Sequence, residues 1–161
     1  MSVVPRSALF VCLGNICRSP IAEATFKHLV SERGQANDWD VDSAATSRYE
    51  IGNPPDPRGQ ACMKRHDIFK HVEKHRARQI TKDDYNKFDY IFGMDDSNMS
   101  DLKRMAPSGG HKAKLFKLGE FDSDKSCEST IEDPYYATGD KEFEEVYEQV
   151  KRSCSGFLDS L

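Results

Sequence analysis

The fold of this chain is decided by the stretch VCLGNICRSP at residues 11–20. An apolar run before it predicts a buried strand over residues 8–13, and Pro20 begins a helical pattern that extends to Val30. Proline is favoured at a first helical position because its missing N–H would have no helical partner there. We therefore predict a strand, a tight loop and a helix start, which together point N–H groups and the positive helix end at an anion, above all phosphate.

Two reactive side chains, Cys12 and Arg18, lie at the ends of this loop with five residues between them. A wrapped loop places the Cys12 sulfur beneath the N–H groups and Arg18 at the rim. Because the same positive field favours a thiolate, we expect Cys12 to be ionised near neutral pH. The planar fork of Arg18 suits two phosphate oxygens, which a lysine does not match. The other interpretation, a structural cysteine beside a surface arginine, is disfavoured by the residues between them.

The remaining loop residues fit this interpretation. Gly14 is expected to form a backbone turn closed to other residues, and Asn15 to enter the left-handed region and bond within the loop. The Ser19 hydroxyl is placed to donate to the Cys12 sulfur. The predicted phosphate-binding residues are Leu13, Gly14, Asn15, Ile16, Cys17, Arg18 and Ser19.

This loop resembles the phosphate-binding loop of the low-molecular-weight protein tyrosine phosphatases. The similarity continues through DSAA at 42–45, IGNPPD at 51–56, MD at 94–95 and DPYY at 133–136, and it covers nearly the whole chain. The resemblance implies a single phosphatase domain over residues 1–161 that hydrolyses phosphotyrosine in proteins and small aryl phosphates. It also implies a phosphocysteine intermediate, inorganic phosphate as product, and no cofactor or metal.

A phosphate ester also needs a proton for its leaving oxygen, and the resemblance points to Asp133 as that acid. Pro134 restricts Asp133 to extended geometry. Glu132 is the alternative acid, and a capping or surface aspartate is the other interpretation of Asp133.

The resemblance assigns further roles around the loop. Tyr49, Glu50, Tyr135 and Tyr136 are expected to line a slot for a flat phenyl phosphate, and a tyrosine kinase is a possible partner acting on Tyr135 or Tyr136. The residues expected to support the loop are Ser43, His66 and His75. Since residues 67–74 form a longer segment than the family pattern, His71 competes with His75.

Oxidation gives a role to the second cysteine of the loop. The resemblance implies a reversible Cys12–Cys17 disulfide that protects the nucleophile; a buried loop thiol is the alternative. Cys62, Cys127 and Cys154 are predicted to be packing or surface cysteines.

Composition restricts the partners and the compartment. A length of 161 residues fits one domain, and a net charge of −4 disfavours a general nucleic-acid binder. No apolar run approaches the roughly 20 residues of a membrane span, and residues 1–7 lack a signal-peptide core. Five cysteines without a regular framework favour a reducing compartment, so we expect a cytoplasmic protein. No Asp/His cluster has metal-ligand spacing.

The order of elements predicts the fold class. Further strands are expected at 39–45, 90–92 and 114–118, with helices at 57–66, after residue 81, at about 96–105 and at 141–160. Residues 119–139 show no period and are predicted to be a loop. Alternating strands and helices indicate a three-layer α/β/α fold with a four-stranded parallel sheet, in which ligands bind at the carboxyl ends of strands.

Three other functions compete with this interpretation. An arsenate reductase needs further cysteines near the end of the third strand, where this chain has FGM at 92–94. Phosphoarginine phosphatases carry a threonine in place of Ile16. A non-catalytic phosphotyrosine-binding module would not need Cys12, Arg18 and Asp133 together.

Overall fold

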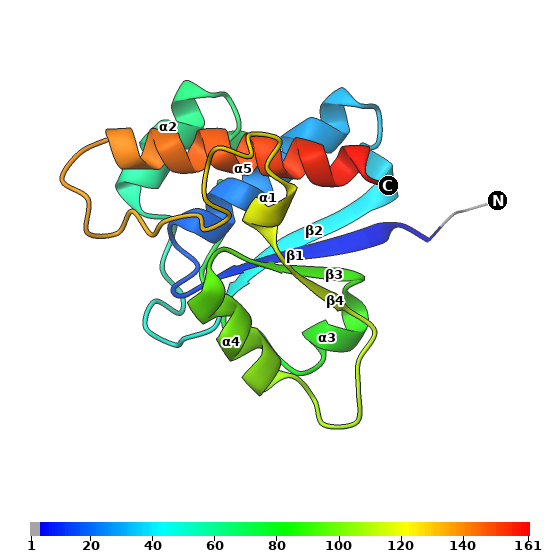
Figure 1. The fold of residues 1–161 in the computed structure, drawn as a ribbon. Coiled ribbons are helices and arrows are strands. Elements are labelled where there is room, and N and C mark those ends of the chain that lie inside the picture. Colours follow the sequence, from blue (N-terminus) through cyan, green and yellow to red (C-terminus); the bar gives the residue numbers. More distant parts are fainter. Residues whose placement is uncertain (1–3) are drawn as a thin grey trace.

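Four parallel strands form the centre of the computed structural model, which describes residues 4–161 (Figure 1). They are β1 (Arg6–Cys12), β2 (Trp39–Ala45), β3 (Tyr90–Gly93) and β4 (Lys114–Lys117), and their order in the sheet is β2-β1-β3-β4. Every neighbouring pair is parallel, so the predicted four-stranded parallel sheet is confirmed. β1 is central, and Cys12 at its end pairs with Ala45 of β2.

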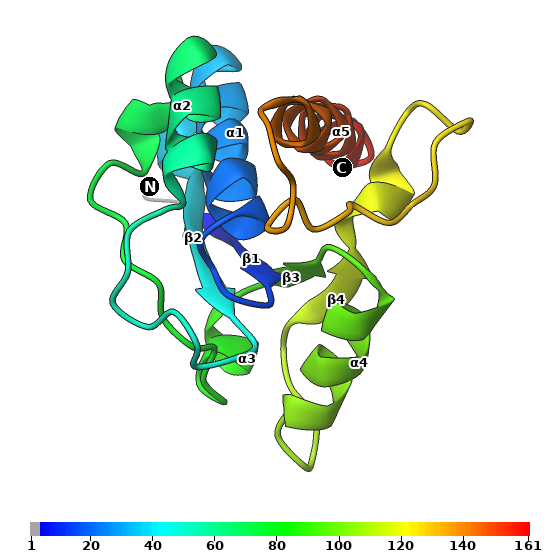
Figure 2. The same cartoon turned by 90° about the vertical axis from the view of Figure 1, so that its left-hand side faces the viewer.

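Helices cover both faces of this sheet (Figures 1 and 2). One face carries α1 (Arg18–Glu32), α2 (Pro57–Arg65) and α5 (Lys141–Asp159), and the other carries α3 (Asp84–Lys87) and α4 (Asp96–Met105). Short 3₁₀ helices lie at η1 (Ala36–Asp38), η2 (Phe69–His71) and η3 (Leu118–Phe121). The predicted three-layer α/β/α class is therefore confirmed.

Alternating side chains of β1 divide the core in two. Leu9 and Val11 pack with Tyr85 and Leu102 on the α3/α4 side, whereas Phe10 belongs to the larger cluster beneath α1 and α5. Both sets are fully buried, so the strand that precedes the loop is fixed from two sides.

The predicted apolar stripe of α5 is also confirmed. All of its members are buried: Phe143, Val146, Tyr147, Val150, Cys154, Phe157 and Leu158. Across residues 4–161, the structure shows no helix with the length and apolar character that crossing a membrane requires.

Some predicted boundaries were wrong near the loop. β1 ends at Cys12 rather than residue 13, and α1 begins at Arg18 rather than Pro20. Pro20 is the third helical residue, a position whose N–H also has no partner within the helix. η3 occupies the start of the stretch predicted to be a loop at 119–139. By contrast, Asp56 caps α2 as predicted, accepting a hydrogen bond from the Arg58 N–H.

The segments that bear the predicted site lie at one end of the sheet. The loop after β1, the chain after β2 and the segment before α5 converge at the carboxyl ends of the strands, on the left of Figure 1. Residues more than a hundred positions apart in the sequence thereby face one another.

Candidate active site

The loop after β1 wraps around the Cys12 sulfur. The Asn15 backbone N–H donates to Sγ at 3.3 Å, and the Ser19 hydroxyl lies 3.1 Å from Sγ, as the sequence predicted. Cys12 is 3% exposed, so the sulfur lies at the base of the loop and is approached from one side. Hydrogen-bond donors directed at a sulfur favour its thiolate form.

Asn15 holds this loop in shape. Its φ is 60°, the left-handed region, and its side chain is fully buried. The amide Nδ2 donates to the Ser19 and Ser43 hydroxyls at 2.7 and 3.0 Å, and Oδ1 accepts from the Arg78 N–H at 3.1 Å. One side chain therefore connects the loop to α1, β2 and the segment before α3.

The expected role of Gly14 was wrong. Among the described residues, the one loop position with positive φ between β1 and α1 is Asn15, and Gly14 lies outside that region. A Cβ on Gly14 would lie 3.4 Å from Glu50 Cγ, an ordinary contact, so the space at this position does not require a glycine either.

A buried carboxylate supports the loop from behind. Ser43 donates to Glu23 Oε1 at 2.6 Å, and Lys27 binds Oε2 at 2.6 Å. His75 Nδ1 lies 3.8 Å from the same Glu23 carboxylate, and its Nε2 lies 3.1 Å from the Asn15 carbonyl oxygen. The structure therefore places Ser43 and His75 where loop support was expected. Sequence reasoning missed Glu23, since a glutamate within a helix carries no local sign of burial.

The predicted role of supporting the loop after β1 was wrong for His66. Its Nε2 lies 2.6 Å from Glu144 Oε2, and its ring stacks on Tyr147 with 3.8 Å between centroids. His66 ends α2 on the side facing α5, and so it points away from the loop. His71, the competitor of His75, packs against His28 instead.

Arg18 is anchored rather than free at the rim, which corrects its predicted position. It is 2% exposed, and its Nη1 donates to Asp95 Oδ2 at 2.6 Å and to the Ile131 carbonyl at 3.0 Å. Its Nη2 lies 3.6 Å from Asp133 Oδ2. Burial alone would lower the pKa of Arg18, but the Cys12 sulfur and the two carboxylates raise it above its usual value.

This anchoring leaves one edge of the guanidinium for a ligand. Within residues 4–161, the Arg18 Nε finds no hydrogen-bond partner although it is buried. Nε and Nη2 share one edge of the fork, and that edge suits two oxygens of one phosphate. Sequence reasoning missed Asp95 as the anchor of Arg18, although its place directly after β3, beside β1, was a usable signal.

Asp133 reaches the site from the segment before α5. Its Oδ1 accepts from the Tyr135 N–H at 3.1 Å, which orients the carboxylate. Arg58 holds the following turn by donating to the Tyr135 and Ala137 carbonyls at 2.9 and 2.7 Å. Hydrogen bonds from Arg58 lower the pKa of Asp56, which keeps this pair charged. Glu132, the alternative acid, lines only a neighbouring hollow, whereas Asp133 borders both that hollow and the space above Cys12.

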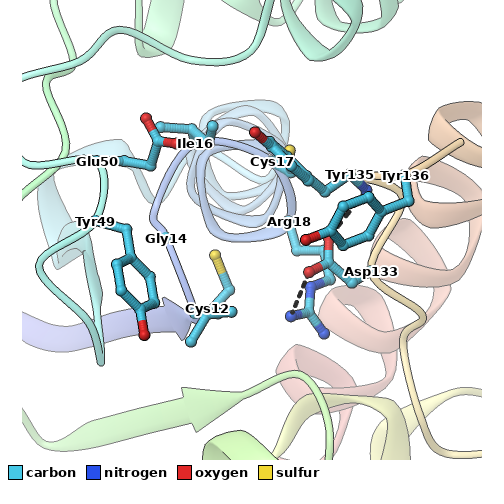
Figure 3. A pocket seen from close by; sticks show the side chains of 11 residues that line it. Cys12, Gly14, Ile16, Cys17, Arg18, Tyr49, Glu50, Asp133, Tyr135 and Tyr136 are labelled. Atoms are coloured by element: carbon cyan, nitrogen blue, oxygen red, sulfur yellow. Dashed lines mark hydrogen bonds and ion pairs between the residues drawn. The ribbon is translucent and has the colours of Figure 1, made fainter.

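A cavity of about 250 Å³ opens above the Cys12 sulfur. Figure 3 shows Tyr49 and Tyr135 on opposite sides of it, with Cys12 between them at the base. Tyr49 and Tyr136 are 80% and 88% exposed, so these rings form the outer walls rather than part of the core. The expected slot residues, Glu50 included, all line this cavity.

Cys17 lines the same cavity as a second thiol. Burial raises the pKa of Cys17 far above its usual value, and the nearby Asp56 carboxylate adds to this effect. Cys17 is therefore held as the neutral thiol, and the structure contains it and Cys12 as free cysteines.

A family model and a curated relative give the same description. A model of the family described as "Low molecular weight phosphotyrosine protein phosphatase" matches residues 7–161. A protein of that name from Gallus gallus is 57% identical over 155 residues, covering 96% of this chain and 94% of the relative.

Solved structures also match over nearly their full length. The crystal structure of Primo-1 has a TM-score of 0.88 and 45% identity, and the match covers 96% of this chain and 97% of that one. The crystal structure titled DARP, drosophila arginine phosphatase, has a TM-score of 0.88 and 41% identity, covering 95% and 96%.

The left-handed conformation of Asn15 gives a prediction about stability. Asn15→Ala removes buried hydrogen bonds and places an alanine at φ 60°, so we expect the free energy of unfolding to fall by about 3 kcal/mol or more. Asn15→Gly removes the same hydrogen bonds without the backbone strain and should be less destabilising by about 1 kcal/mol. Urea unfolding of the two variants measures this difference. Equal losses would show that the backbone conformation of residue 15 does not matter.

Proposed function

Because the chain belongs to the low molecular weight phosphotyrosine protein phosphatases, hydrolases that act on phosphotyrosine in proteins, we propose that Cys12 is its nucleophile. The observation that carries this proposal is the Cys12 sulfur at the base of the cavity, with the Asn15 N–H directed at it. Small aryl phosphates are proposed as further substrates because they carry the same phenyl phosphate group.

The first step transfers the phosphoryl group to sulfur. The Cys12 thiolate attacks phosphorus in line, so that an S–P bond forms as the bond to the tyrosyl oxygen breaks. Asp133, in its acid form, gives its proton to the departing oxygen. The Nε/Nη2 edge of Arg18 and the loop N–H groups stabilise the three equatorial oxygens.

The second step releases inorganic phosphate. The Asp133 carboxylate takes a proton from water as the water oxygen attacks phosphorus, and the S–P bond breaks to return the Cys12 thiolate. No step of this proposal uses a metal or a cofactor. The protein contribution is positioning together with fixed positive charge, as expected for phosphoryl transfer.

The shape of the cavity suggests how substrates are chosen. The phenyl ring of phosphotyrosine fits between the rings of Tyr49 and Tyr135 while its phosphate reaches Cys12. The shorter side chain of phosphoserine does not span this depth.

The exposure of Tyr135 and Tyr136, 42% and 88%, supports the proposal that a tyrosine kinase modifies these two residues. Finding both unmodified by mass spectrometry in kinase-active cells would contradict it.

Phosphoarginine hydrolysis is the second candidate, favoured by the likeness to the structure titled an arginine phosphatase. Ile16 supports phosphotyrosine instead, because an apolar side chain at the cavity wall suits a phenyl ring better than a guanidinium. Turnover of a phosphoarginine peptide and a phosphotyrosine peptide of the same sequence separates the two candidates.

Replacing the nucleophile tests the proposal directly. We expect Cys12→Ser to lower kcat on phosphotyrosyl peptides by at least about 10³-fold while the peptides still bind, because a serine oxygen here stays protonated. Steady-state assays and fluorescence anisotropy measure the two effects. Cys127→Ser, at an exposed thiol, is the control and should keep full activity. Undiminished turnover by Cys12→Ser would overturn the proposal.

Replacing the acid tests the role of Asp133. Asp133→Asn should lower kcat/KM by about 10² to 10⁴-fold for poor leaving groups and much less for phenols that leave easily without a proton. The measurement is kcat/KM, which reports the first step alone, across a series of aryl phosphates of graded phenol acidity. Glu132→Gln is the matched control at the neighbouring carboxylate. If the rate depends steeply on the acidity of the phenol in Glu132→Gln and not in Asp133→Asn, then Glu132 and not Asp133 is the acid.

Oxidation provides a further test, since the loop also holds Cys17. We propose that peroxide oxidises the Cys12 thiolate to a sulfenic acid, and that the Cys17 thiol then displaces water to form a disulfide. Cys17→Ser should therefore keep its activity, but under excess peroxide its Cys12 sulfenic acid should be oxidised further to the sulfinic acid, so that dithiothreitol restores less activity than in the wild type. Peptide mapping that finds only sulfinic Cys12 in the wild-type protein would contradict the disulfide.

We also propose that the protein is located in the cytoplasm, as expected from its five cysteines.

A further inference from the structure

Three side chains that commonly bind metals meet between α2 and α5, outside the cavity around Cys12. They are Cys62, His66 and Glu144, and their Sγ, ring nitrogen and carboxylate oxygen all lie within 4.8 Å of one another. Cys62 and His66 are four residues apart at the end of α2 and share its face, whereas Glu144 lies in the first turn of α5. Because Glu144 is distant in the sequence, residue spacing did not reveal this cluster.

The side chains are already oriented toward a common point. His66 Nε2 lies 2.6 Å from Glu144 Oε2, and stacking on Tyr147 fixes the plane of the imidazole ring. Arg65 Nε binds the other carboxylate oxygen, Oε1, at 2.7 Å. The carboxylate is thereby held through Oε1 while Oε2 faces the histidine. Outer partners of this kind orient ligands in metal sites.

We propose that Cys62, His66 and Glu144 bind one Zn²⁺ ion between α2 and α5. A thiolate, an imidazole and a carboxylate are the ligands that zinc takes in proteins, and three of them leave the fourth tetrahedral position for water. Magnesium and calcium prefer oxygen ligands alone, so this mixed set selects a transition metal.

The charges and protons of the binding step balance. The S–H bond of Cys62 breaks, its proton goes to water, and an S–Zn bond forms. His66 binds through Nε2 as the neutral ring with its proton on Nδ1, so the Nε2 proton that Glu144 Oε2 accepts in the free site moves through water to Nδ1. The thiolate and the carboxylate together offset the charge of the ion, so the site stays neutral. Access comes through His66 and Glu144, whose side chains are 27% and 33% exposed, while Cys62 closes the buried side.

The position of the site gives it a structural consequence. Arg58, in the first turn of α2, holds the turn after Asp133, and α5 follows that segment directly. A metal ion bound between α2 and α5 therefore links the two helices that hold the segment 131–140 in place. We expect zinc to stabilise the fold, whether or not it changes turnover.

The test uses the full chain carrying Cys12→Ser and Cys17→Ser, so that the thiols of the cavity do not bind the metal. Titration with Co²⁺ should give one equivalent of binding, with a sulfur-to-cobalt charge-transfer band and the visible bands of tetrahedral cobalt, and Zn²⁺ should displace it. At a free Zn²⁺ concentration about 100 times the Kd, the Tm should rise by roughly 5 to 10 °C.

Variants in the same background identify the ligands. Cys62→Ala should remove the charge-transfer band, and Glu144→Gln should weaken binding at least about tenfold while leaving the buried packing of Cys62 unchanged. The matched controls are Glu145→Gln, the next carboxylate on α5, and Cys154→Ala, another fully buried thiol. Both controls should bind as the parent does. The proposal is overturned if no Co²⁺ binds, if the band survives Cys62→Ala, or if Zn²⁺ raises the Tm of Glu144→Gln and Glu145→Gln equally.

Discussion

The left-handed backbone of Asn15 is the constraint on which the site depends. At φ 60° the chain turns so that its N–H faces the Cys12 sulfur, and for a residue with a side chain this conformation costs about 1–2 kcal/mol. Glycine would avoid that cost, yet it would leave the loop without an anchor. The asparagine amide repays the strain with hydrogen bonds to Ser19, Ser43 and the Arg78 N–H. Geometry of the reactive loop is thus maintained by a buried polar network behind it.

Arg18 raises a second problem, because a buried guanidinium is costly unless it is paired. Asp95 provides the pair and binds Nη1, which lies outside the Nε/Nη2 edge that we propose for phosphate. Had the carboxylate bound the Nε/Nη2 edge, it would have competed with phosphate for the same donors. Asp133 lies farther away, 3.6 Å from Nη2. In the proposed mechanism the Asp133 carboxylate therefore lies near the substrate phosphate while the Nε/Nη2 edge of Arg18 stays open.

Sequence reasoning recovered the parts of this protein that local chemistry determines. The loop from Cys12 to Arg18, the Asp56 cap and the stripe of α5 each carry their signal within a few turns of chain. Glu23 and Asp95 were missed because their partners come from other elements, and a carboxylate in a sequence does not reveal whether it is buried. His66 was misplaced for the same reason, since the direction of the last turn of α2 is set by its packing against α5.

The five cysteines show how the same side chain takes different roles through its surroundings. Burial raises the pKa of Cys62 to about 12 and that of Cys154 above its usual range, so without a bound metal both are neutral thiols. Cys12 is equally well covered, at 3% exposed, but its sulfur receives an N–H and faces a cavity edged by Arg18. Exposure therefore does not distinguish Cys12 from Cys62 and Cys154. What distinguishes Cys12 is that the loop of residues 12–18 directs an N–H at its sulfur, whereas Cys154 is surrounded by the buried core.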